Sequence, residues 1–418
     1  MDKEKDSKED SNKASISRRE FIKLSAIAGS GIAIGAAGIG LFGGRGSSQG
    51  VSSHTLDAKA EAVPMYGEHQ AGIITPQQTY MYLASFRITV SDRASLIRLF
   101  RDWTRFSDLS TAGGTMQTGD NPLLPPSDTG ETLDLPAARL TVTFGFGPSF
   151  FNEGGKDRFG ITAMAPLYLK DIPRMARDNL NPALSGGDVC IQVCAEDQQV
   201  AFHAIRNFTR LSTGMAALNW MEEGFISGTA GKTPRNLFGF KDGTANALHQ
   251  TAAGYDEVVW AADGEPDWMK GGSYLAYRKV RMLLEMWDRS SLTDQEDTFG
   301  RSKESGAAYG KSNEFDPVDV SQMPADAHVR LAKQAGQQIH RRAYSYTGSV
   351  DPRTGNVDAG LLFISFQKNP DLQFLPMLQL MQNQDALNPY TSHVASALFA
   401  CPKGLREGQY IAQNILEA

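Results

Sequence analysis

Residues 236–246 read NLFGFKDGTAN and contain a G-x-x-D-G pattern in which Gly239 and Gly243 flank Asp242. Glycines at such places let the backbone turn tightly and approach a ligand closely. Asp-Gly is also one of the commonest turn dipeptides, so this stretch alone predicts either a ligand-binding turn or an ordinary one.

Two downstream stretches carry further candidate functional residues. Residues 324–332 read PADAHVRLA, and residues 339–346 read IHRRAYSY. Taken by itself, His328 is better interpreted as a structural histidine than as a ligand. Arg341 and Arg342 are compatible with a solvated pair of charges at a strand edge. The alternation of side chains along a strand predicts that His340 faces away from Arg341.

The composition is that of an ordinary globular protein. The 418 residues predict two to three domains, with 41% hydrophobic and 21% charged residues. A net charge of −6 argues against nucleic-acid binding. Three cysteines, Cys190, Cys194 and Cys401, exclude a disulfide-dense scaffold and a Cys-cluster zinc or iron–sulfur site. Seven histidines are enough for a cofactor with an imidazole ligand.

The N-terminal segment is typical of an export signal. Residues 17–23 read SRREFIK and precede a mildly apolar Gly/Ala/Ile run over 24–44. Consecutive arginines in this setting indicate a twin-arginine signal, and the alternative is a transmembrane anchor preceded by incidental basic residues. Because twin-arginine substrates cross the membrane already folded, the signal favours a cofactor-containing enzyme that acts outside the cytoplasm.

Beyond Val63 the apolar pattern predicts mixed α and β structure without the rhythm of a parallel sheet. Strands are predicted over 80–90, 140–146, 189–194, 215–226, 273–282, 360–367 and 396–401, and helices over 96–106, 198–211, 284–287 and 372–381. The polar residues 288–327 predict a long functional or mobile insertion. Two α+β units of antiparallel sheet flanked by helices fit this order.

Taken together and in this order, the GFKDGTAN, AHVRLA and RRAYSY runs resemble the dye-decolourising peroxidases, and more narrowly their exported, iron-linked EfeB or deferrochelatase/peroxidase subgroup. Further matching runs are GEHQAGI at 67–73, GGSYL at 271–275, FGRSK at 299–303 and GLLF at 360–363. The resemblance covers the chain from about residue 64. The segment between His328 and Arg341 is shorter than in some relatives, which we expect to alter a surface loop.

The resemblance implies the domain organisation. Residues 1–63 would form the signal and a Gly/Ser-rich linker. Residues 64–235 and 236–418 would form two ferredoxin-like α+β domains, each an antiparallel sheet flanked by helices. Haem would lie mainly in the second domain.

The resemblance also implies the roles of the site residues. His328 would bind the iron of haem b, and Asp242 and Arg341 would be the catalytic residues on the other side of the haem. Peroxide cleavage needs a group that moves a proton and a fixed positive charge, which a carboxylate and a guanidinium supply. The implied haem-binding residues are Gly239, Phe240, Lys241, Gly243, Thr244, His328, Arg341 and Phe363.

Other residues carry weaker expectations. His69 would line the haem edge or lie in the surface or core, and Arg278 and Arg281 would pair with haem propionates or be exposed strand arginines. Leu361, Leu362 and Phe363 would form a pocket wall or pack in a strand core. The remaining histidines, His54, His203, His249 and His393, have no partner at ligand spacing.

The implied function is that of an exported haem peroxidase. It would reduce hydrogen peroxide through a ferryl intermediate and oxidise an electron donor, with Fe(II) in a ferrous-iron uptake system as the expected donor. The expected partners are the twin-arginine translocase, an iron permease and an iron-binding protein, and a homodimer is compatible with the resemblance. The alternatives are a deferrochelatase that releases iron from haem with the porphyrin intact and a non-catalytic haem or iron carrier.

Overall fold

The computed structural model describes residues 61–418 apart from 117–120, 230 and 353. The predicted signal at 17–23 lies outside the described residues. No helix in the described part of the chain is long and apolar enough to cross a membrane.

The strands form two antiparallel halves. Their bounds are β1 Tyr80–Ile88, β2 Thr141–Phe146, β3 Val189–Ala195, β4 Ala216–Phe225, β5 Ser273–Met282, β6 His340–Arg341, β7 Tyr344–Val350, β8 Val357–Gln367 and β9 Thr391–Cys401. The order is β4-β1-β3-β2 in the first half and β9-β5-β8-β7 in the second, with β6 also paired to β8. Each half therefore places its last strand beside its first, which confirms two ferredoxin-like antiparallel sheets.

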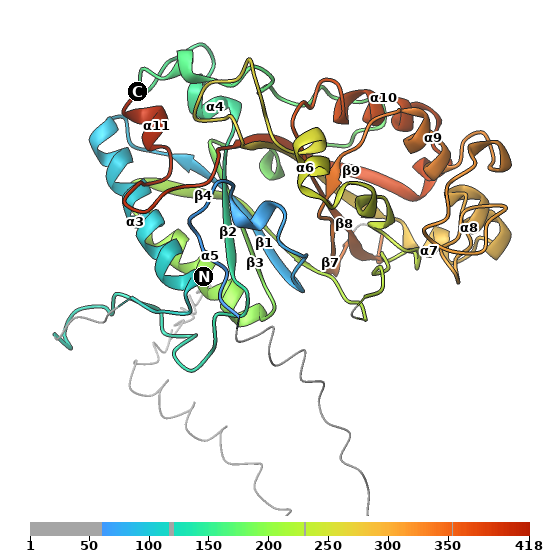
Figure 1. The fold of residues 1–418 in the computed structure, drawn as a ribbon. Coiled ribbons are helices and arrows are strands. Elements are labelled where there is room, and N and C mark those ends of the chain that lie inside the picture. Colours follow the sequence, from blue (N-terminus) through green and yellow to red (C-terminus); the bar gives the residue numbers. More distant parts are fainter. Residues whose placement is uncertain (1–60, 117–120, 230, 353) are drawn as a thin grey trace, which may run out of the picture. The chain divides into compact units, whose positions relative to one another are not determined.

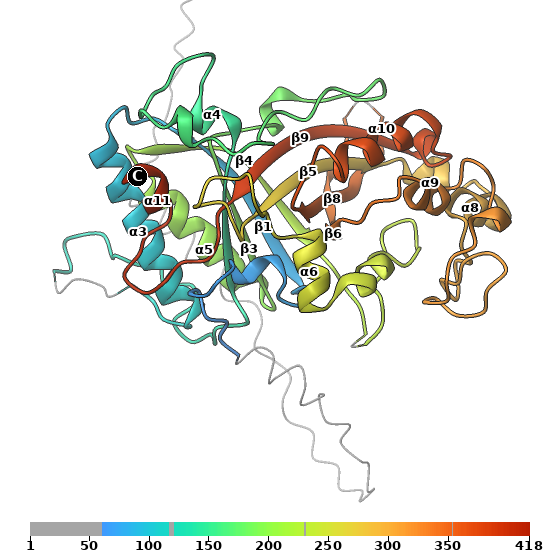
Figure 2. The ribbon, with the colours of Figure 1, turned by 45° about the horizontal axis from the view of Figure 1, so that its top comes forward.

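The two sheets join at both edges. Phe146 of β2 pairs with Ala400 of β9, and Phe225 of β4 pairs with Ser345 of β7. Figure 2 shows β9 running beside β5 and reaching the first half. The pairings form a closed circuit in which one face of each sheet turns toward the other.

Helices cover the outer face of the first sheet. The helix bounds along the chain are α3 Arg93–Thr111, α4 Pro148–Phe151, α5 Gln198–Leu211, α6 Ala252–Val258, α7 Leu284–Trp287, α8 Leu292–Phe299, α9 His328–Gln334, α10 Phe374–Gln384 and α11 Gln413–Leu416. Asp92 accepts a hydrogen bond from Ser95 N and begins α3 as an N-cap. In Figure 1, α3 and α5 lie against the first half, and α8, α9 and α10 lie at the second.

Alternation along the strands separates the layers. Met81 and Leu83 of β1 belong to a buried cluster between the sheets, whereas Phe86 packs with the cluster under α3 and α5. In the second sheet, Leu362 faces the inter-sheet core, and its neighbours Leu361 and Phe363 face outward beneath α10. The outer face of the second sheet is thus left to form a site.

Most predicted elements are confirmed, and the differences lie where side-chain patterning is weak. The strand over 273–282 and the helices over 198–211 and 284–287 have the predicted bounds. The polar insertion also contains α8, whose Phe299 is buried. β7 was not predicted because its outer half, residues 347–350, is exposed and has a single large apolar side chain, Val350. Cys190, Cys194 and Cys401 are free, as expected for the first two.

Candidate active site

A cavity of about 370 Å³ lies on the outer face of the second sheet. Its walls come from β5, β8, α9, α10 and the 236–246 stretch, segments far apart in the sequence. Much of the wall is apolar, through Phe240, Phe299, Leu361, Phe363, Met377 and Met381. Phe240 stacks on Phe299 with ring centroids 4.1 Å apart, so the 236–246 stretch and the insertion meet at this wall.

His328 begins α9 and lines the cavity. Its Nδ1 lies 2.7 Å from Oδ2 of Asp385, a carboxylate 5% exposed. Burial disfavours the charged imidazolium, but the charge and hydrogen bond of Asp385 outweigh burial and raise the pKa of His328. With Nδ1 held by Asp385, Nε2 is the nitrogen available to a metal, an arrangement that fixes the orientation of a ligating histidine.

Asp242 and Arg341 meet in the same cavity. Arg341 Nη1 donates to Asp242 Oδ1 over 2.9 Å, and both side chains remain partly exposed, at 24% and 18% respectively. No described residue donates a hydrogen bond to Asp242 Oδ2. The pair therefore offers a carboxylate oxygen and a guanidinium side by side, 99 residues apart in the sequence.

Asn246 ties the two residues together through the main chain. Its Nδ2 donates to Arg341 O over 2.6 Å, and its Oδ1 accepts from Arg341 N over 3.1 Å. Asn246 lies in the 3-10 helix Thr244–His249, which follows Asp242 and Gly243 directly. The segment that carries the carboxylate thus also sets the position of the arginine backbone.

The other predicted residues of the 236–246 stretch support this geometry in different ways. Lys241 Nζ and Thr244 Oγ1 both donate to the buried carboxylate of Glu314, which anchors the insertion. Gly239 and Gly243 have φ values of +86° and +106°, where a side chain would be strained. Neither glycine lines the large cavity, but Gly243 borders a smaller pocket of about 20 Å³ that also includes Asp242 and Arg341.

Several weaker expectations are corrected. Arg278 is 1% exposed and is neither solvated nor free, because its guanidinium pairs with Asp178 through both Nη atoms and its Nε donates to His393 Nδ1 over 3.1 Å. Arg281 does not line the cavity and pairs with Asp351 over 2.6 Å.

The structure also decides the surroundings of two histidines: His69 takes the predicted alternative outside the haem edge, and His393 differs from the expectation. His69 lies away from the cavity, where it stacks on Trp260 at 3.7 Å and bonds to Gly271 O through Nδ1. His393, for which no partner was expected, lines the cavity and has its Nδ1 fixed by Arg278. Burial and the nearby Arg278 charge lower the pKa of His393 to about 4, so its imidazole is neutral at neutral pH.

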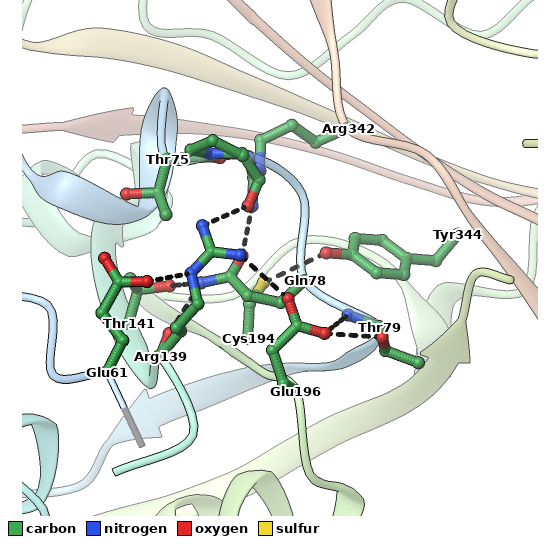
Figure 3. Close-up of polar contacts among 11 residues, drawn as sticks. Glu61, Thr75, Gln78, Thr79, Arg139, Thr141, Cys194, Glu196, Arg342 and Tyr344 are labelled. Carbon is green, nitrogen blue, oxygen red and sulfur yellow. Dashed lines mark hydrogen bonds and ion pairs between the residues drawn. The ribbon is translucent and has the colours of Figure 1, made fainter. Parts of the chain in front are cut away.

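Arg342 lies in a polar cluster with Thr75 and Gln78 (Figure 3), outside the lining of the cavity that contains Arg341. Its guanidinium donates to Thr75 O and, over 2.8 Å, to Gln78 Oε1. The solvated arginine pair that the sequence allowed is therefore wrong, because one arginine enters the cavity and the other binds the first half of the fold. His340 also turns away from the cavity, as predicted, and contacts His249 over 3.2 Å.

Sequence reasoning missed Asp385, Asn246, Glu314 and His393 as site residues. Asn246 ends the quoted 236–246 stretch and Glu314 lies in the polar insertion, whereas Asp385 and His393 lie in stretches without a chemical signature. Their partners are 57 or more residues away, so no local pattern reports the contact.

The residues present fit a haem. The cavity joins apolar, aromatic walls to a histidine with one ring nitrogen available and to an acid–arginine pair. Apolar walls suit the macrocycle, and a histidine nitrogen suits its iron.

Comparisons with known proteins agree with the site. The Dyp-type peroxidase N-terminal and C-terminal family models match residues 70–226 and 233–406. A deferrochelatase from Escherichia coli strain K12 is 39% identical over 370 residues, 84% of this chain and 86% of the relative. A deferrochelatase from Shigella flexneri is 39% identical over 382 residues, 86% of this chain and 89% of the relative.

Solved structures show the same likeness. Ferric DtpA from Streptomyces lividans is 34% identical with a TM-score of 0.79, covering 87% of this chain and 99% of its own. A DyP-type peroxidase from Cellulomonas bogoriensis is 35% identical with a TM-score of 0.78, covering 86% and 99%. This chain therefore belongs to the Dyp-type peroxidase family and is a haem-dependent peroxidase.

Proposed function

We propose that this protein is an exported haem b peroxidase in which His328 binds the iron and Asp242 and Arg341 act on hydrogen peroxide. The observation that carries the proposal is the meeting, in one cavity, of the His328–Asp385 pair and the Asp242–Arg341 pair. Gly239, Phe240, Lys241, Gly243, Thr244 and Phe363 would shape the haem site around them.

Asp242 is the proton carrier in this proposal. Its carboxylate accepts a proton from one peroxide oxygen and returns it to the other, which then leaves as water. Oδ1 is held by Arg341, so the transfer uses Oδ2, which no described residue occupies with a hydrogen bond. Haem, when bound, supplies the electrons that reduce the peroxide.

Arg341 supplies a fixed positive charge. Its guanidinium stabilises the negative charge that develops on the departing oxygen, and it stays charged at any working pH. Asn246 holds its backbone in place, which keeps the charge positioned before the reaction begins. Asp385 orients His328 so that Nε2 faces the iron.

Variants of the acid–arginine pair test this assignment. Asp242→Asn should slow the reaction with peroxide about 10²–10⁴-fold, and Arg341→Leu should slow it about 10²–10³-fold. Stopped-flow spectra of the haem after mixing with peroxide measure both rates across pH. Both variants should keep their haem, and Arg289→Met, an exposed arginine, serves as the control. Wild-type rates in both variants would overturn the assignment.

The physiological donor and location form the second part of the proposal. The twin-arginine signal supports export through the translocase, and the subgroup resemblance supports Fe(II) oxidation beside an iron permease and an iron-binding protein. Peroxide-dependent loss of Fe(II), followed with an Fe(II) chelator, should exceed the rate without protein. Equal rates with and without protein would show that Fe(II) is not an electron donor of this protein.

A deferrochelatase activity is the second candidate, because the relatives from Escherichia coli and Shigella flexneri carry that name. Metal-free porphyrin that appears from haem without peroxide, detected by its fluorescence, would favour it. Retained haem with neither porphyrin release nor peroxide turnover would instead support a carrier.

A further inference from the structure

Five lysine and arginine side chains line the cavity, and three of them are paired with carboxylates. The pairs are Lys241 with Glu314, Arg278 with Asp178, and Arg341 with Asp242. The two others are Arg301 and Lys333, and neither forms an ion pair with a carboxylate in the described part of the chain.

Arg301 and Lys333 reach the cavity from separate elements. Arg301 follows the C-cap of α8, and its Nη1 donates to the backbone oxygens of Gly306 over 2.6 Å and Glu314 over 3.0 Å. Lys333 lies in the last turn of α9, the helix that His328 begins. Because the two backbone carbonyls are neutral, they position Arg301 without neutralising its positive charge. Lys333 has no side-chain hydrogen bond to a described residue.

The surroundings of Arg301 and Lys333 lower the pKa of both side chains. Burial lowers the pKa of Arg301, Glu314 offsets part of this effect, and the charge of Arg341 adds to it. Burial and the charge of Arg301 lower the pKa of Lys333. Arg301 is partly buried, whereas Lys333 lines the cavity with its side chain exposed. A partly buried cation without a carboxylate in ion-pair contact is unfavourable, so this part of the wall favours a negatively charged ligand.

We propose that Arg301 and Lys333 bind the two propionate carboxylates of haem. The inference rests on the proposed function, in which this cavity holds haem. Arg301 and Lys333, two cations without carboxylate partners, match the two propionates in number and charge. The planar guanidinium of an arginine can also donate two parallel hydrogen bonds to one carboxylate. Arg278 does not take this role, because Asp178 and His393 already occupy its guanidinium.

The test compares haem with its dimethyl ester, in which both propionates have lost their charge. The full-length protein is reconstituted with either ligand, and the rate of its transfer to excess apomyoglobin is measured. We expect the ester to leave wild type at least about 10-fold faster than haem, since charge-assisted hydrogen bonds to carboxylates are lost.

Lys333→Met and Arg301→Met should each release haem about 10-fold faster while releasing the ester at nearly the wild-type rate. The preference for haem over its ester therefore shrinks in each variant. Arg301→Lys should restore part of that preference, because the lysine keeps the positive charge but cannot donate two parallel hydrogen bonds to one carboxylate. Lys311→Met and Arg289→Met, which remove exposed charges outside the cavity wall, should leave the preference unchanged.

If both Met variants discriminate haem from its ester as wild type does, the carboxylate subsite is wrong. If Arg301→Met does not fold, because the loop loses its two carbonyl contacts, Lys333→Met and Arg301→Lys decide the question. A loss of ester binding equal to the loss of haem binding would mean a packing role and would also overturn the subsite. A wild-type protein that binds neither ligand would instead overturn the proposed haem function.

Discussion

Arg341 and Arg342 are adjacent in the sequence, yet their side chains serve different parts of the molecule. Arg341 enters the cavity and bonds to Asp242, whereas Arg342 crosses to Thr75 and Gln78. Side chains at successive positions of an extended strand point to opposite faces, so the pair divides between site and scaffold.

His328 is the residue on which haem retention depends. His328→Ala should give a folded protein that has lost most of its haem, because Asp385 can orient no other ring toward the iron. The ratio of Soret to protein absorbance measures the loss, and circular dichroism checks the fold. His393 lines the same cavity, so His393→Ala is the informative control and should keep the ligand. Full haem content in the His328 variant would contradict the assignment.

Asn246 positions Arg341 without contacting the reacting atoms in our proposal. Asn246→Ala removes both hydrogen bonds to the Arg341 backbone and should slow the reaction with peroxide about 10–100-fold, because small misplacements of a catalytic group are costly. Asn246→Asp keeps the acceptor for Arg341 N and should fall between wild type and the Ala variant. Stopped-flow rates and haem content are measured together, and unaltered rates in both variants would show that the strand alone holds Arg341.

At the scale of the elements, Arg342 links the second sheet to the segment before β1. Figure 3 shows its guanidinium beside Gln78, whose Nε2 in turn donates to Arg139 O and Thr141 Oγ1. Arg342→Met should lower the free energy of unfolding by about 2–4 kcal/mol, since one buried and one part-buried acceptor lose a charged donor. Urea denaturation measures the loss, with Arg289→Met as the surface control. A loss below 0.5 kcal/mol, about the size expected of a surface substitution, would mean that water replaces the arginine.

The His249–His340 contact joins the 3-10 helix after Asp242 to β6. Burial lowers the pKa of both imidazoles, and burial together with the Arg342 charge takes that of His340 to about 3. Both rings are therefore neutral in the folded protein at neutral pH. Below about pH 6.5 these histidines bind protons in the unfolded chain but not in the folded protein. The free energy of unfolding therefore falls as the pH falls toward 3.

His340→Gln should flatten this dependence. Each buried neutral histidine contributes up to about 1.4 kcal/mol of lost stability per pH unit below its unfolded pKa. Unfolding free energies from urea titrations between pH 7 and pH 4 compare the two proteins. The free energy of unfolding should change more steeply with pH in wild type than in the variant. Parallel curves would show that protonation of His340 does not destabilise the folded protein.

At the scale of the whole molecule, the two sheets close on each other through single pairings at β2–β9 and β4–β7. Their shared interior contains side chains from both halves, including Leu83, Trp220, Tyr277 and Phe399. The outer face of the second sheet is free to form the cavity because this interior already buries its inner face.

The proposed export concerns the whole chain, and the predicted twin-arginine signal lies outside the described residues. The double variant Arg18→Lys, Arg19→Lys should accumulate inside the cell as a precursor, because the twin-arginine route reads that pair. Immunoblots of cell fractions measure the precursor and the exported protein. Normal export of the variant would mean that another route reads this segment.

Local patterning in the sequence predicted the parts of this protein that depend on neighbours along the chain. An apolar run located β1, alternating apolar residues located β2 and β3, and the 3.6-residue period located α3. The motif resemblance led to His328, Asp242 and Arg341, which do meet in one cavity. Their catalytic roles stay a prediction until the variants are measured.

Only the tertiary structure decided which side chains support these residues. Asp385 reaches His328 across 57 residues, and Asp178 reaches Arg278 across 100, so neither contact leaves a mark in local spacing. The sequence also left Arg278 and Arg342 as exposed or ligand-binding cations, whereas packing buries both and supplies their partners. A periodic pattern reports whether a side chain faces the core, but its partner is set by how sheets and helices dock, because that docking brings distant parts of the chain within hydrogen-bonding distance.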